Sequence, residues 1–477
     1  MKVLLIMPHV SEHVFRPGAM TPITLLAIAA VLRKAGHEPM IIDLNLLHPP
    51  NTTDNINDFC INYVIDVIKD SDFHPGMVGI NCFTAARFPF VRRLADSIKK
   101  HLPNSPIVLG GMHPTLFYRE ILEHCLSIDA VVIGEGELQA VALAEAYSSG
   151  TMATRGGLQN IHALAFRDRD GQIIYNPRKD FIQDLDSLPM LAWDLLHFKE
   201  YYADHSVWHN PRGLKINMSV PIYTSRSCPF DCNFCSSDSL MGRGLRLRSP
   251  IRVVDEMEML YKTYGQNYFG FIDDNLVVRK EHIMTICNEI IRRGMNIQFE
   301  SYVGYHINSL DEDIIDAMVR AGATYFILPI EHGNDEIRNK IIGKKLSRDK
   351  IREVVAICKR YDVLTGTSCI MGFPEDTTEA LDDTLNLLDE LQLDVVNVHT
   401  LIPFPGTKVF DQAVREHLFF DAIDFDSLWN GSWIMDATEG YFYIKPYKMS
   451  LDELMKYRKK FDAIRLESLA KQRARHL

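Results

Sequence analysis

Three cysteines at Cys228, Cys232 and Cys235 constrain this chain most, because their C-x3-C-x2-C spacing puts three thiols on one short loop. Three thiolates can hold three corners of a four-iron cluster and leave the fourth iron without a protein ligand. Such an iron can chelate a substrate and pass it an electron. A structural zinc site is the alternative, but it needs a fourth Cys or His nearby, and the next candidates, Asp238 and Cys287, fit no known zinc spacing.

The composition is typical of a soluble globular protein. The chain has 477 residues, of which 47% are apolar and 24% charged, and this length suggests two or three domains. A net charge of −11 argues against a nucleic-acid partner. The six cysteines outside the loop do not look like a disulfide framework, so we expect a reducing compartment. The apolar run at the N-terminus stops at Pro8, too early for a signal peptide or a membrane span. We therefore expect an oxygen-sensitive cytoplasmic protein with no transmembrane segment.

Strand and helix patterns alternate five times in the first third of the chain, beginning with a buried strand at residues 2–7. This alternation predicts a doubly wound parallel α/β sheet, which we assign to residues 1–147. Ligands of such sheets bind at the carboxyl ends of the strands. There, Gly110 and Gly111 allow a ligand to approach the backbone, and the turn 134–137 opens a helix N-terminus that favours polar or anionic groups. A plain turn is the alternative for each glycine pair.

The alternation resumes at Ile222 and gives six strand–helix units, which predict a (β/α)6 partial barrel over residues 216–410. A barrel of this kind places its chemistry at the carboxyl ends of the strands. Asp273 and Asp274 follow the second strand, Glu331 ends the fourth and Gly372 ends the fifth. These residues should therefore converge near the cysteine loop, although a solvated loop carboxylate is the alternative for each aspartate.

These motifs resemble those of the radical S-adenosylmethionine (radical SAM) enzymes, whose hallmark is the cysteine spacing with an aromatic residue, here Phe234, before the last cysteine. The first 145 residues or so are similar to the cobalamin-binding domain that precedes the barrel in one large subfamily. In that family the open iron of a [4Fe-4S] cluster binds the amino and carboxylate groups of S-adenosylmethionine. One-electron reduction then cleaves it to a 5′-deoxyadenosyl radical.

The resemblance implies roles for the residues at the strand ends. The cluster ligands would be Cys228, Cys232 and Cys235. S-Adenosylmethionine would contact Phe234, Asp273, Asp274, Glu331 and Gly372. Cobalamin would contact Thr21, Pro22, Thr84, Gly110, Gly111, His113, Gly134, Glu135, Gly136 and Glu137.

The sequence departs from its relatives at the cobalt-ligand motif. The loop after the first strand has no Asp-x-His-x-x-Gly motif, so we expect base-off cobalamin without a histidine ligand. We interpret His9 and His113 as structural or secondary contacts rather than cobalt ligands.

A second departure follows the third barrel strand, where many relatives carry an arginine and this chain has none. Tyr305, His306 or nothing would replace it. Side chains alternate along a strand, so Glu300 and Tyr302 share one face, and the sequence leaves open which face points inward. The candidates on the substrate side are Tyr302, Tyr305 and His306.

Two segments flank the barrel. We interpret residues 148–215 as a linker that contains a hairpin, with strands at 163–166 and 173–175. Residues 411–477 are rich in aromatic side chains and end in an amphipathic helix, which a capping box of Ser450 and Glu453 starts. This region should close the open side of the barrel.

The resemblance implies a cobalamin-dependent methyltransferase that acts on an unactivated carbon, using the 5′-deoxyadenosyl radical and methylcobalamin. The alternative is a non-methylating relative, such as an oxidative ring cyclase of the Mg-protoporphyrin monomethyl ester cyclase type. A corrinoid-binding redox sensor is a third hypothesis. The expected partners are a small-molecule substrate and an electron donor such as flavodoxin or ferredoxin.

Overall fold

The computed structural model describes residues 1–9, 21–48, 55–70, 72–149, 157–203, 209–431 and 441–475. They form two compact units. The N-terminal unit comprises Met1–Tyr202, Ser239–Met241 and Asp424–Ile434. The barrel unit comprises Ala203–Asp238, Gly242–Ile423 and Met435–Leu477.

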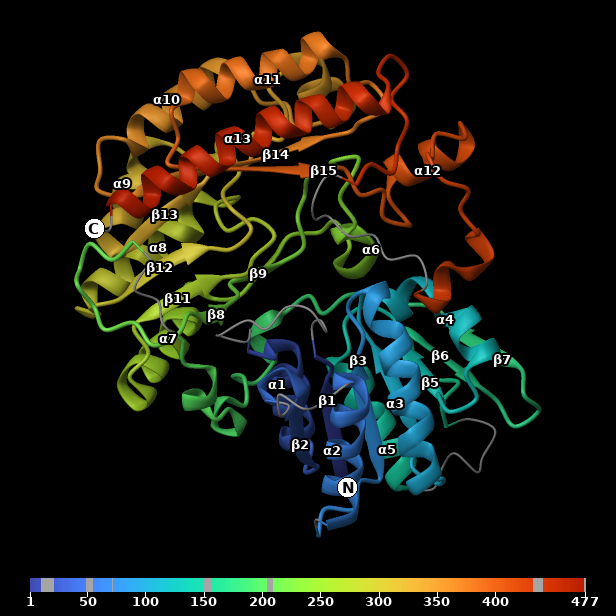
Figure 1. Cartoon of the computed structure of the whole chain (residues 1–477). Coiled ribbons are helices and arrows are strands. Elements are labelled where there is room, and N and C mark those ends of the chain that lie inside the picture. Colours follow the sequence, from blue (N-terminus) through green and yellow to red (C-terminus); the bar gives the residue numbers. More distant parts are fainter. Residues whose placement is uncertain are drawn as a thin grey trace. The chain divides into compact units, whose positions relative to one another are not determined.

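The N-terminal unit contains the expected doubly wound sheet (Figure 1). Its five parallel strands are β1 (Lys2–Met7), β2 (Glu38–Asp43), β3 (Met77–Asn81), β4 (Ile107–Gly110) and β5 (Ala130–Val132). Its helices are α1 (Ile23–Lys34), α2 (Ile56–Asp70), α3 (Phe88–His101), α4 (Met112–His124) and α5 (Glu137–Ser148). Alternate residues of β1 enter different cores: Leu4 and Ile6 pack with α2, α3 and α4, whereas Val3 and Leu5 pack with α1 and α5. The strand order β2-β1-β3-β4-β5 reverses between β1 and β3, where sheets of this topology bind ligands.

The predicted hairpin exists, but it belongs to this sheet. Its strands β6 (Leu164–Arg167) and β7 (Ile173–Asn176) add antiparallel to β5. A bare β5 would be an exposed edge, and the hairpin covers it. The unit continues to Tyr202, so much of the segment expected as a linker is folded with the first domain; Trp193 is buried there and the hydroxyl of Tyr201 donates to Asp43 at 2.8 Å.

The barrel unit has the six parallel strands that the sequence predicts, in the order β15-β14-β13-β12-β11-β8. They are β8 (Val220–Ile222), β11 (Tyr268–Phe271), β12 (Gln298–Ser301), β13 (Ala323–Ile327), β14 (Leu364–Met371) and β15 (Val395–Thr400). The helices between them are α7 (Pro250–Tyr264), α8 (Lys280–Arg292), α9 (Glu312–Ala321), α10 (Arg348–Cys358) and α11 (Thr378–Leu391). A two-stranded ribbon of β9 (Ser225–Arg226) and β10 (Arg246–Leu247) brackets the cysteine loop and the short helix α6 (Ser237–Met241).

The structure settles which face of β12 points inward. Phe299 and Ser301 are fully buried, as expected on the face that the helices cover. Glu300 is half-buried, and Tyr302 is 36% exposed. Glu300 pairs in register with Gly270 of β11 and Tyr325 of β13, so these positions share the inner face of the barrel.

The C-terminal helix α13 (Leu451–Arg475) lies along the free edge of β15, after the shorter helix α12 (Lys408–Arg415) (Figure 1). The Arg458 guanidinium donates to the Val398 carbonyl at 2.9 Å, and the Val396 amide donates to the Ser468 hydroxyl at 3.2 Å. These contacts satisfy backbone groups that an edge strand leaves open. The predicted capping box is present: the Ser450 amide donates to the Glu453 carboxylate at 2.8 Å.

Candidate active site

The cysteine loop starts from a fixed, strained turn. Ser227 has φ of 73°, which is unusual for a residue with a side chain, and its buried hydroxyl donates to the Gly242 carbonyl. A strained backbone of this kind is stable only when surrounding contacts hold it in place, and such strain is frequent at functional sites. The loop turns again at its end, where the Cys235 amide donates to the Cys232 carbonyl at 3.1 Å.

The three thiols of the loop lie close enough to influence one another's ionisation. Burial raises the pKa of Cys228, Cys232 and Cys235, that of Cys232 to about 11. Neighbouring thiols add to the shifts of Cys228 and Cys232, and nearby carboxylates add to that of Cys235. The loop therefore holds thiols within electrostatic range of one another, and a bound metal would stabilise their thiolate forms. Over the described ranges, no three His, Cys, Asp or Glu side chains surround a single metal ion. The thiolates that hold a four-iron cluster stand farther apart than the ligands of one metal ion, because each thiolate binds a different iron.

Glu331 lies beside this loop in an unusual backbone conformation. Its φ is 67°, its amide donates to the Ser368 carbonyl at 3.1 Å, and its carbonyl accepts from the Ile370 amide at 2.7 Å. The backbone is thereby pinned to β14. The carboxylate accepts a 2.7 Å hydrogen bond from Lys344, and each side chain of this ion pair is only 9% exposed.

Lys344 is a site residue that the sequence analysis missed. Burial acts to lower the pKa of Lys344, but the Glu331 carboxylate and the thiols of Cys232 and Cys228 raise it above its ordinary value. The lysine is therefore a buried cation facing both the carboxylate and the cluster loop. No spacing rule marks it, because it stands 13 positions after Glu331 in a loop whose path the sequence does not reveal.

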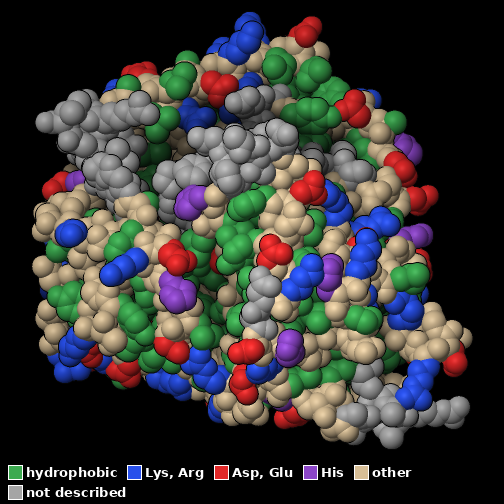
Figure 2. All heavy atoms as spheres, turned by 60° about the horizontal axis from the view of Figure 1, so that its bottom comes forward, with side chains coloured by type: hydrophobic (Ala, Val, Ile, Leu, Met, Phe, Trp, Pro, Cys, Tyr) green, Lys and Arg blue, Asp and Glu red, His purple; other side chains and the backbone are tan. Residues whose placement is uncertain are grey.

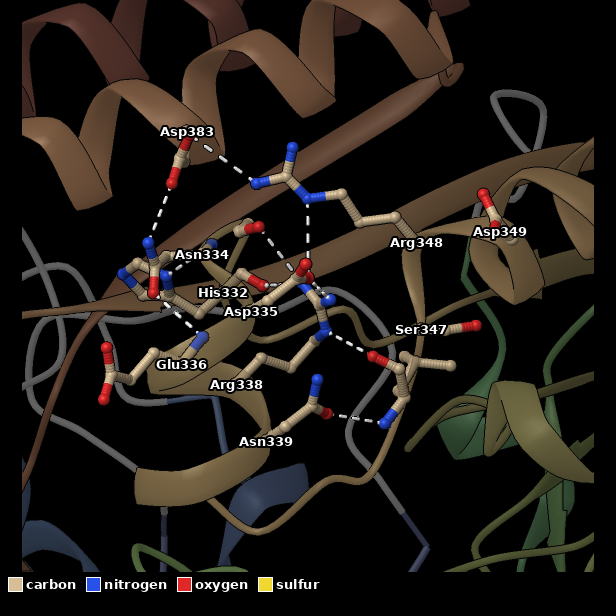
Figure 3. A network of polar contacts seen from close by, with 12 residues as sticks. His332, Asn334, Asp335, Glu336, Arg338, Asn339, Ser347, Arg348, Asp349 and Asp383 are labelled. Atoms are coloured by element: carbon tan, nitrogen blue, oxygen red, sulfur yellow. Dashed lines mark hydrogen bonds and ion pairs between the residues drawn. The ribbon is translucent and has the colours of Figure 1, made fainter.

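Arg338 builds the loop that carries Lys344 (Figure 3). This fully buried arginine donates to the carbonyls of Leu346 at 2.8 Å, His332 at 2.9 Å and Gly333 at 3.1 Å, and it pairs with Asp335. The backbone forms a π-helical turn over Ile337–Ile341, a feature frequent at functional sites. One buried side chain thus holds both ends of the loop in place.

His332 joins the motifs of the fourth and fifth strands. Its Nδ1 accepts from the Asn334 amide at 3.0 Å, so Nε2 carries the proton and donates to Asp376 at 3.1 Å. The other oxygen of Asp376 accepts from the amides of Gly372 at 2.6 Å and Phe373 at 3.1 Å.

The backbone conformation at position 372 favours glycine. Its φ is 99°, and a Cβ there would lie 3.3 Å from the ring of Phe442. Its contact with S-adenosylmethionine stays a prediction, as does that of Phe234, which packs edge-on against Phe373 with ring centres 6.4 Å apart.

The two aspartates after β11 have different surroundings. The buried Asp273 carboxylate accepts from the Thr224 amide at 3.0 Å, the Thr224 hydroxyl at 2.8 Å and the Ser225 hydroxyl. It therefore ties the start of the cysteine loop to the second strand. Asp274 is exposed and accepts from the hydroxyl of Ser237, just beyond the last cysteine. Asp274 is thus the freer of the two for a ligand.

The structure separates the three substrate-side candidates. Tyr305 is fully buried and packs on Phe326 at 5.2 Å between ring centres, so it does not face a substrate. His306 stacks on Phe230 of the cysteine loop at 3.9 Å, and burial together with the charge of Lys344 lowers its pKa to about 4, so it supplies no positive charge. Only Tyr302 of the three lies on the inner face, where its ring covers Gly270.

Glu300 is a second residue that the sequence analysis did not single out. Burial raises its pKa to about 7, and its charge acts on the hydroxyls of Tyr268, Tyr302 and Tyr325. A carboxyl that holds its proton near neutrality inside a barrel is a functional candidate. The alternation of side chains along β12 placed Glu300 and Tyr302 on one face. Only the pairing of Glu300 with Tyr325 in β13 shows that this is the inner face of the barrel.

In the N-terminal unit, the ends of β3 and β4 leave room for a ligand. A Cβ at Gly110 would have no heavy atom within 4 Å, whereas one at Gly111, with φ of 116°, would lie 2.6 Å from the Cys82 carbonyl. Thr84 follows β3 with an exposed side chain. At the start of α1, within the described part of the chain, the buried hydroxyl of Thr21, next to Pro22, has no hydrogen-bond partner. An orphaned hydroxyl and open backbone at the strand ends fit a polar cofactor.

The residues of the turn after β5 contact other parts of the N-terminal unit. A Cβ at Gly134 would lie 1.9 Å from the guanidinium of Arg178, and the Glu135 carboxylate accepts from the Ile182 amide at 3.0 Å. A Cβ at Gly136 would lie 3.3 Å from Ile28. Glu137 is also buried. These contacts explain the residues structurally, and their contact with cobalamin stays a prediction.

His113 forms a hydrogen bond with a residue from the C-terminal part of the chain. Its Nε2 donates to the Trp429 carbonyl at 2.8 Å, and its ring packs against Phe88 and Phe117. Burial lowers its pKa to about 4, so the ring is neutral. The second histidine, His9, lies 2.9 Å from the side chain of Asn57.

Comparison with known proteins matches both units. Residues 16–144 match the model of the B12-binding domain, and residues 222–388 match that of the radical SAM superfamily. Among curated relatives, an uncharacterized methyltransferase of Pyrococcus horikoshii is 29% identical over 88% of this chain and 84% of the relative. Cytidylyl-2-hydroxyethylphosphonate methyltransferase of Streptomyces wedmorensis is 25% identical over 87% and 82%. The anaerobic magnesium-protoporphyrin IX monomethyl ester cyclase of Cereibacter sphaeroides is 27% identical over 74% of this chain and 55% of the cyclase.

Solved structures share the fold. The radical SAM methyltransferase TsrM of Kitasatospora setae superposes with a TM-score of 0.67 and 19% identity, over 87% of this chain and 75% of TsrM. The cobalamin-dependent radical SAM enzyme OxsB gives a TM-score of 0.72 and 15% identity, over 99% and 71%. Among the described residues, no helix is both long and apolar enough to cross a membrane. The two domains together take cobalamin, a [4Fe-4S] cluster and S-adenosylmethionine, and the chain is therefore a cobalamin-dependent radical SAM enzyme.

Proposed function

We propose that the protein is a C-methyltransferase that acts on an unactivated carbon of a small molecule. The observation that carries this proposal is the extent of the match to relatives named as methyltransferases. The match covers 84% and 82% of the two methyltransferases above but 55% of the Cereibacter cyclase, so it extends over more of the methyltransferases. A hopanoid C-3 methylase of Methylococcus capsulatus, 25% identical over 83% of this chain, supports the same class.

The residues of the barrel unit have distinct tasks in this reaction. When bound, the cluster and S-adenosylmethionine supply a 5′-deoxyadenosyl radical, and cobalamin supplies the methyl group. Cys228, Cys232 and Cys235 anchor the cluster on a loop whose start Asp273 ties to the end of β11. Glu331 favours the cationic ammonium and sulfonium groups of S-adenosylmethionine.

On the substrate side, Glu300 and Tyr302 line the inner face of the barrel. They can orient a substrate by hydrogen bonds and help to keep water from the radical, which is the main work of a protein around such cofactors.

The second candidate is an oxidative ring cyclase. It is favoured by the cyclases among the relatives, one of which, from Rubrivivax gelatinosus, matches over 88% of this chain and 71% of its own length. The same cysteine loop would serve this reaction, so the outcome depends on the substrate and on cobalamin chemistry.

The proposed setting is a reducing cytoplasm, where an electron donor such as flavodoxin or ferredoxin reduces the cluster. All nine cysteines are free, which agrees with such a compartment. On the face shown in Figure 2, acidic and basic side chains are interspersed. Together with the net charge of −11, this surface does not favour nucleic acid as a partner.

The test is anaerobic reconstitution with iron, sulfide and cobalamin, followed by untargeted mass spectrometry of host extracts incubated with S-adenosylmethionine and a reductant. A methyltransferase produces a metabolite heavier by one CH2 and one S-adenosylhomocysteine for each methyl transferred. The variant with Cys228, Cys232 and Cys235 replaced by alanine is the matched control and should give no product. A product that has lost hydrogen, with no S-adenosylhomocysteine, would identify the cyclase instead.

A further inference from the structure

We propose that Lys344 binds the α-carboxylate of S-adenosylmethionine, leaving its partner Glu331 to accept hydrogen bonds from the α-amino group. The proposal rests on the radical SAM assignment and does not depend on methyl transfer. It names a binding residue that neither the cysteine motif nor the strand-end motifs contain.

The first support is the position of the ion pair. Lys344 and Glu331 are 2.7 Å apart, each is 9% exposed, and both act electrostatically on the thiol of Cys232. In this family the amino acid end of S-adenosylmethionine chelates the open iron held by these cysteines. A ligand on that iron would therefore bring its amino group, whose N–H bonds can donate, and its carboxylate next to a buried anion and a buried cation.

The second support is charge complementarity. The ligand's amino group offers N–H donors and its carboxylate carries a negative charge, so the two groups complement Glu331 and Lys344 respectively. A single buried carboxylate without a cation would accept from the amino group but would repel the ligand's own carboxylate.

The third support is the surroundings of the third strand. Relatives commonly carry an arginine there, and neither candidate replacement supplies a cation: Tyr305 is fully buried and uncharged, and His306 is neutral because its pKa is about 4. Lys344 itself contributes to lowering that pKa, so the two side chains are neighbours. Arg243 and Lys408 also lie at the cysteine loop, but both are about half exposed and pair with Asp231. The buried positive charge beside the cysteines is that of Lys344, from the loop after the fourth strand.

The fourth support is preorganisation. Arg338 holds the loop through three carbonyl contacts, and the Leu346 amide donates to the Asn339 side chain at 2.6 Å (Figure 3). A flexible lysine in a fixed loop can move its ammonium from Glu331 to a ligand without refolding the backbone.

The experiment compares two ligands on the cluster-loaded protein: S-adenosylmethionine and its decarboxylated analogue, which keeps the ammonium and sulfonium groups. Binding is measured by anaerobic equilibrium ultrafiltration and by the change in the electron paramagnetic resonance spectrum of the reduced cluster. The variants are Lys344→Met, Lys344→Gln and Lys344→Arg, with Glu331→Gln beside them. Lys340→Met is the matched control, because Lys340 lies in the same loop and is 75% exposed.

Lys344→Met and Lys344→Gln should weaken S-adenosylmethionine binding about ten- to a hundredfold, the range for one charge-assisted hydrogen bond, and should leave binding of the decarboxylated analogue unchanged. Lys344→Arg should restore most of the affinity. Glu331→Gln should weaken both ligands, since both carry the ammonium, and Lys340→Met should affect neither.

Equal weakening of both ligands by the Lys344 variants, at unchanged iron content, would overturn the proposal, because Lys344 would then act only by holding Glu331. Unchanged binding of S-adenosylmethionine would overturn it as well. If Lys344→Met loses iron, Lys344→Gln and Lys344→Arg still decide the question through the comparison of the two ligands. None of these readings depends on finding a methylated product, so the methyltransferase proposal stands or falls separately.

Discussion

Asp273 offers the sharpest test of the site's construction, because the family resemblance and the structure give it different roles. The resemblance implies contact with S-adenosylmethionine, whereas the structure engages its carboxylate with the Thr224 amide and the hydroxyls of Thr224 and Ser225. All three donors reach Oδ1, and only the Thr224 amide also reaches Oδ2. In Asp273→Asn the side-chain oxygen can keep the three bonds to Oδ1, so we expect the loss of the charge and of the one hydrogen bond from the Thr224 amide to Oδ2.

The expected loss is about 1–2 kcal/mol of barrel-unit stability, the range for one hydrogen bond lost at a buried group. The loss of stability should lie below the top of this range. Burial raises the pKa of Asp273, so the wild-type carboxylate carries a desolvation cost that asparagine lacks. Urea unfolding of the metal-free protein measures the loss. Hydrogen exchange of the peptide covering Val220–Cys228 should show faster exchange of the Thr224 amide.

Asp274→Asn is the matched control, because its exposed carboxylate accepts only from Ser237 among the hydrogen bonds of the described residues. We expect its stability to stay within about 0.5 kcal/mol of wild type, as for most surface changes. The reasoning fails if Asp273→Asn unfolds and exchanges like wild type yet loses affinity for S-adenosylmethionine, since Asp273 would then be a ligand contact.

Three further predictions concern other parts of the site. Because the pKa of Glu300 rises from 4.5 to about 7 on folding, its ionisation penalty is absent below pH 4.5 and grows toward pH 7. Glu300→Gln should therefore gain about 3 kcal/mol relative to wild type between pH 4.5 and 8, measured by urea unfolding, and parallel pH profiles would contradict this. Gly372→Ala should destabilise the metal-free protein by about 1–2 kcal/mol, because its φ of 99° is costly for alanine and Phe442 lies 3.3 Å from the new Cβ; an unchanged urea midpoint would refute it. The paramagnetic resonance spectrum of bound cob(II)alamin should show no histidine nitrogen and should be the same in His113→Gln, and histidine hyperfine splitting would disprove base-off binding without a protein ligand.

The sequence was sufficient for what local pattern determines. Both parallel sheets follow from alternating apolar strands and amphipathic helices, and the cysteine loop follows from spacing alone. The hairpin of β6 and β7 was found from its turn, but its membership of the first sheet was not, because edge pairing with β5 depends on tertiary structure. The same holds for Asp424–Ile434, which joins the N-terminal unit through Trp429, more than three hundred residues from its partner His113.

Within the site, sequence reasoning located residues at strand ends but not those brought in by loops. Glu331 was found because it ends a strand, whereas Lys344 reaches it through a loop that a buried Arg338 shapes. Tyr305 was misplaced for the opposite reason: its position after β12 suggested the substrate side, but Gly304, with φ of 96°, turns the chain and directs the ring into the core.

The central claim is best tested by the fate of S-adenosylmethionine labelled in its methyl group. The protein, loaded with cluster and cobalamin, would be incubated under anaerobic conditions with this ligand and titanium(III) citrate, and all products quantified by mass spectrometry. A cobalamin-dependent radical SAM methyltransferase should release both 5′-deoxyadenosine and S-adenosylhomocysteine and should carry the labelled methyl group on its corrinoid. 5′-Deoxyadenosine without S-adenosylhomocysteine or labelled corrinoid would contradict methyl transfer, and the absence of both nucleoside products would contradict the enzyme class itself.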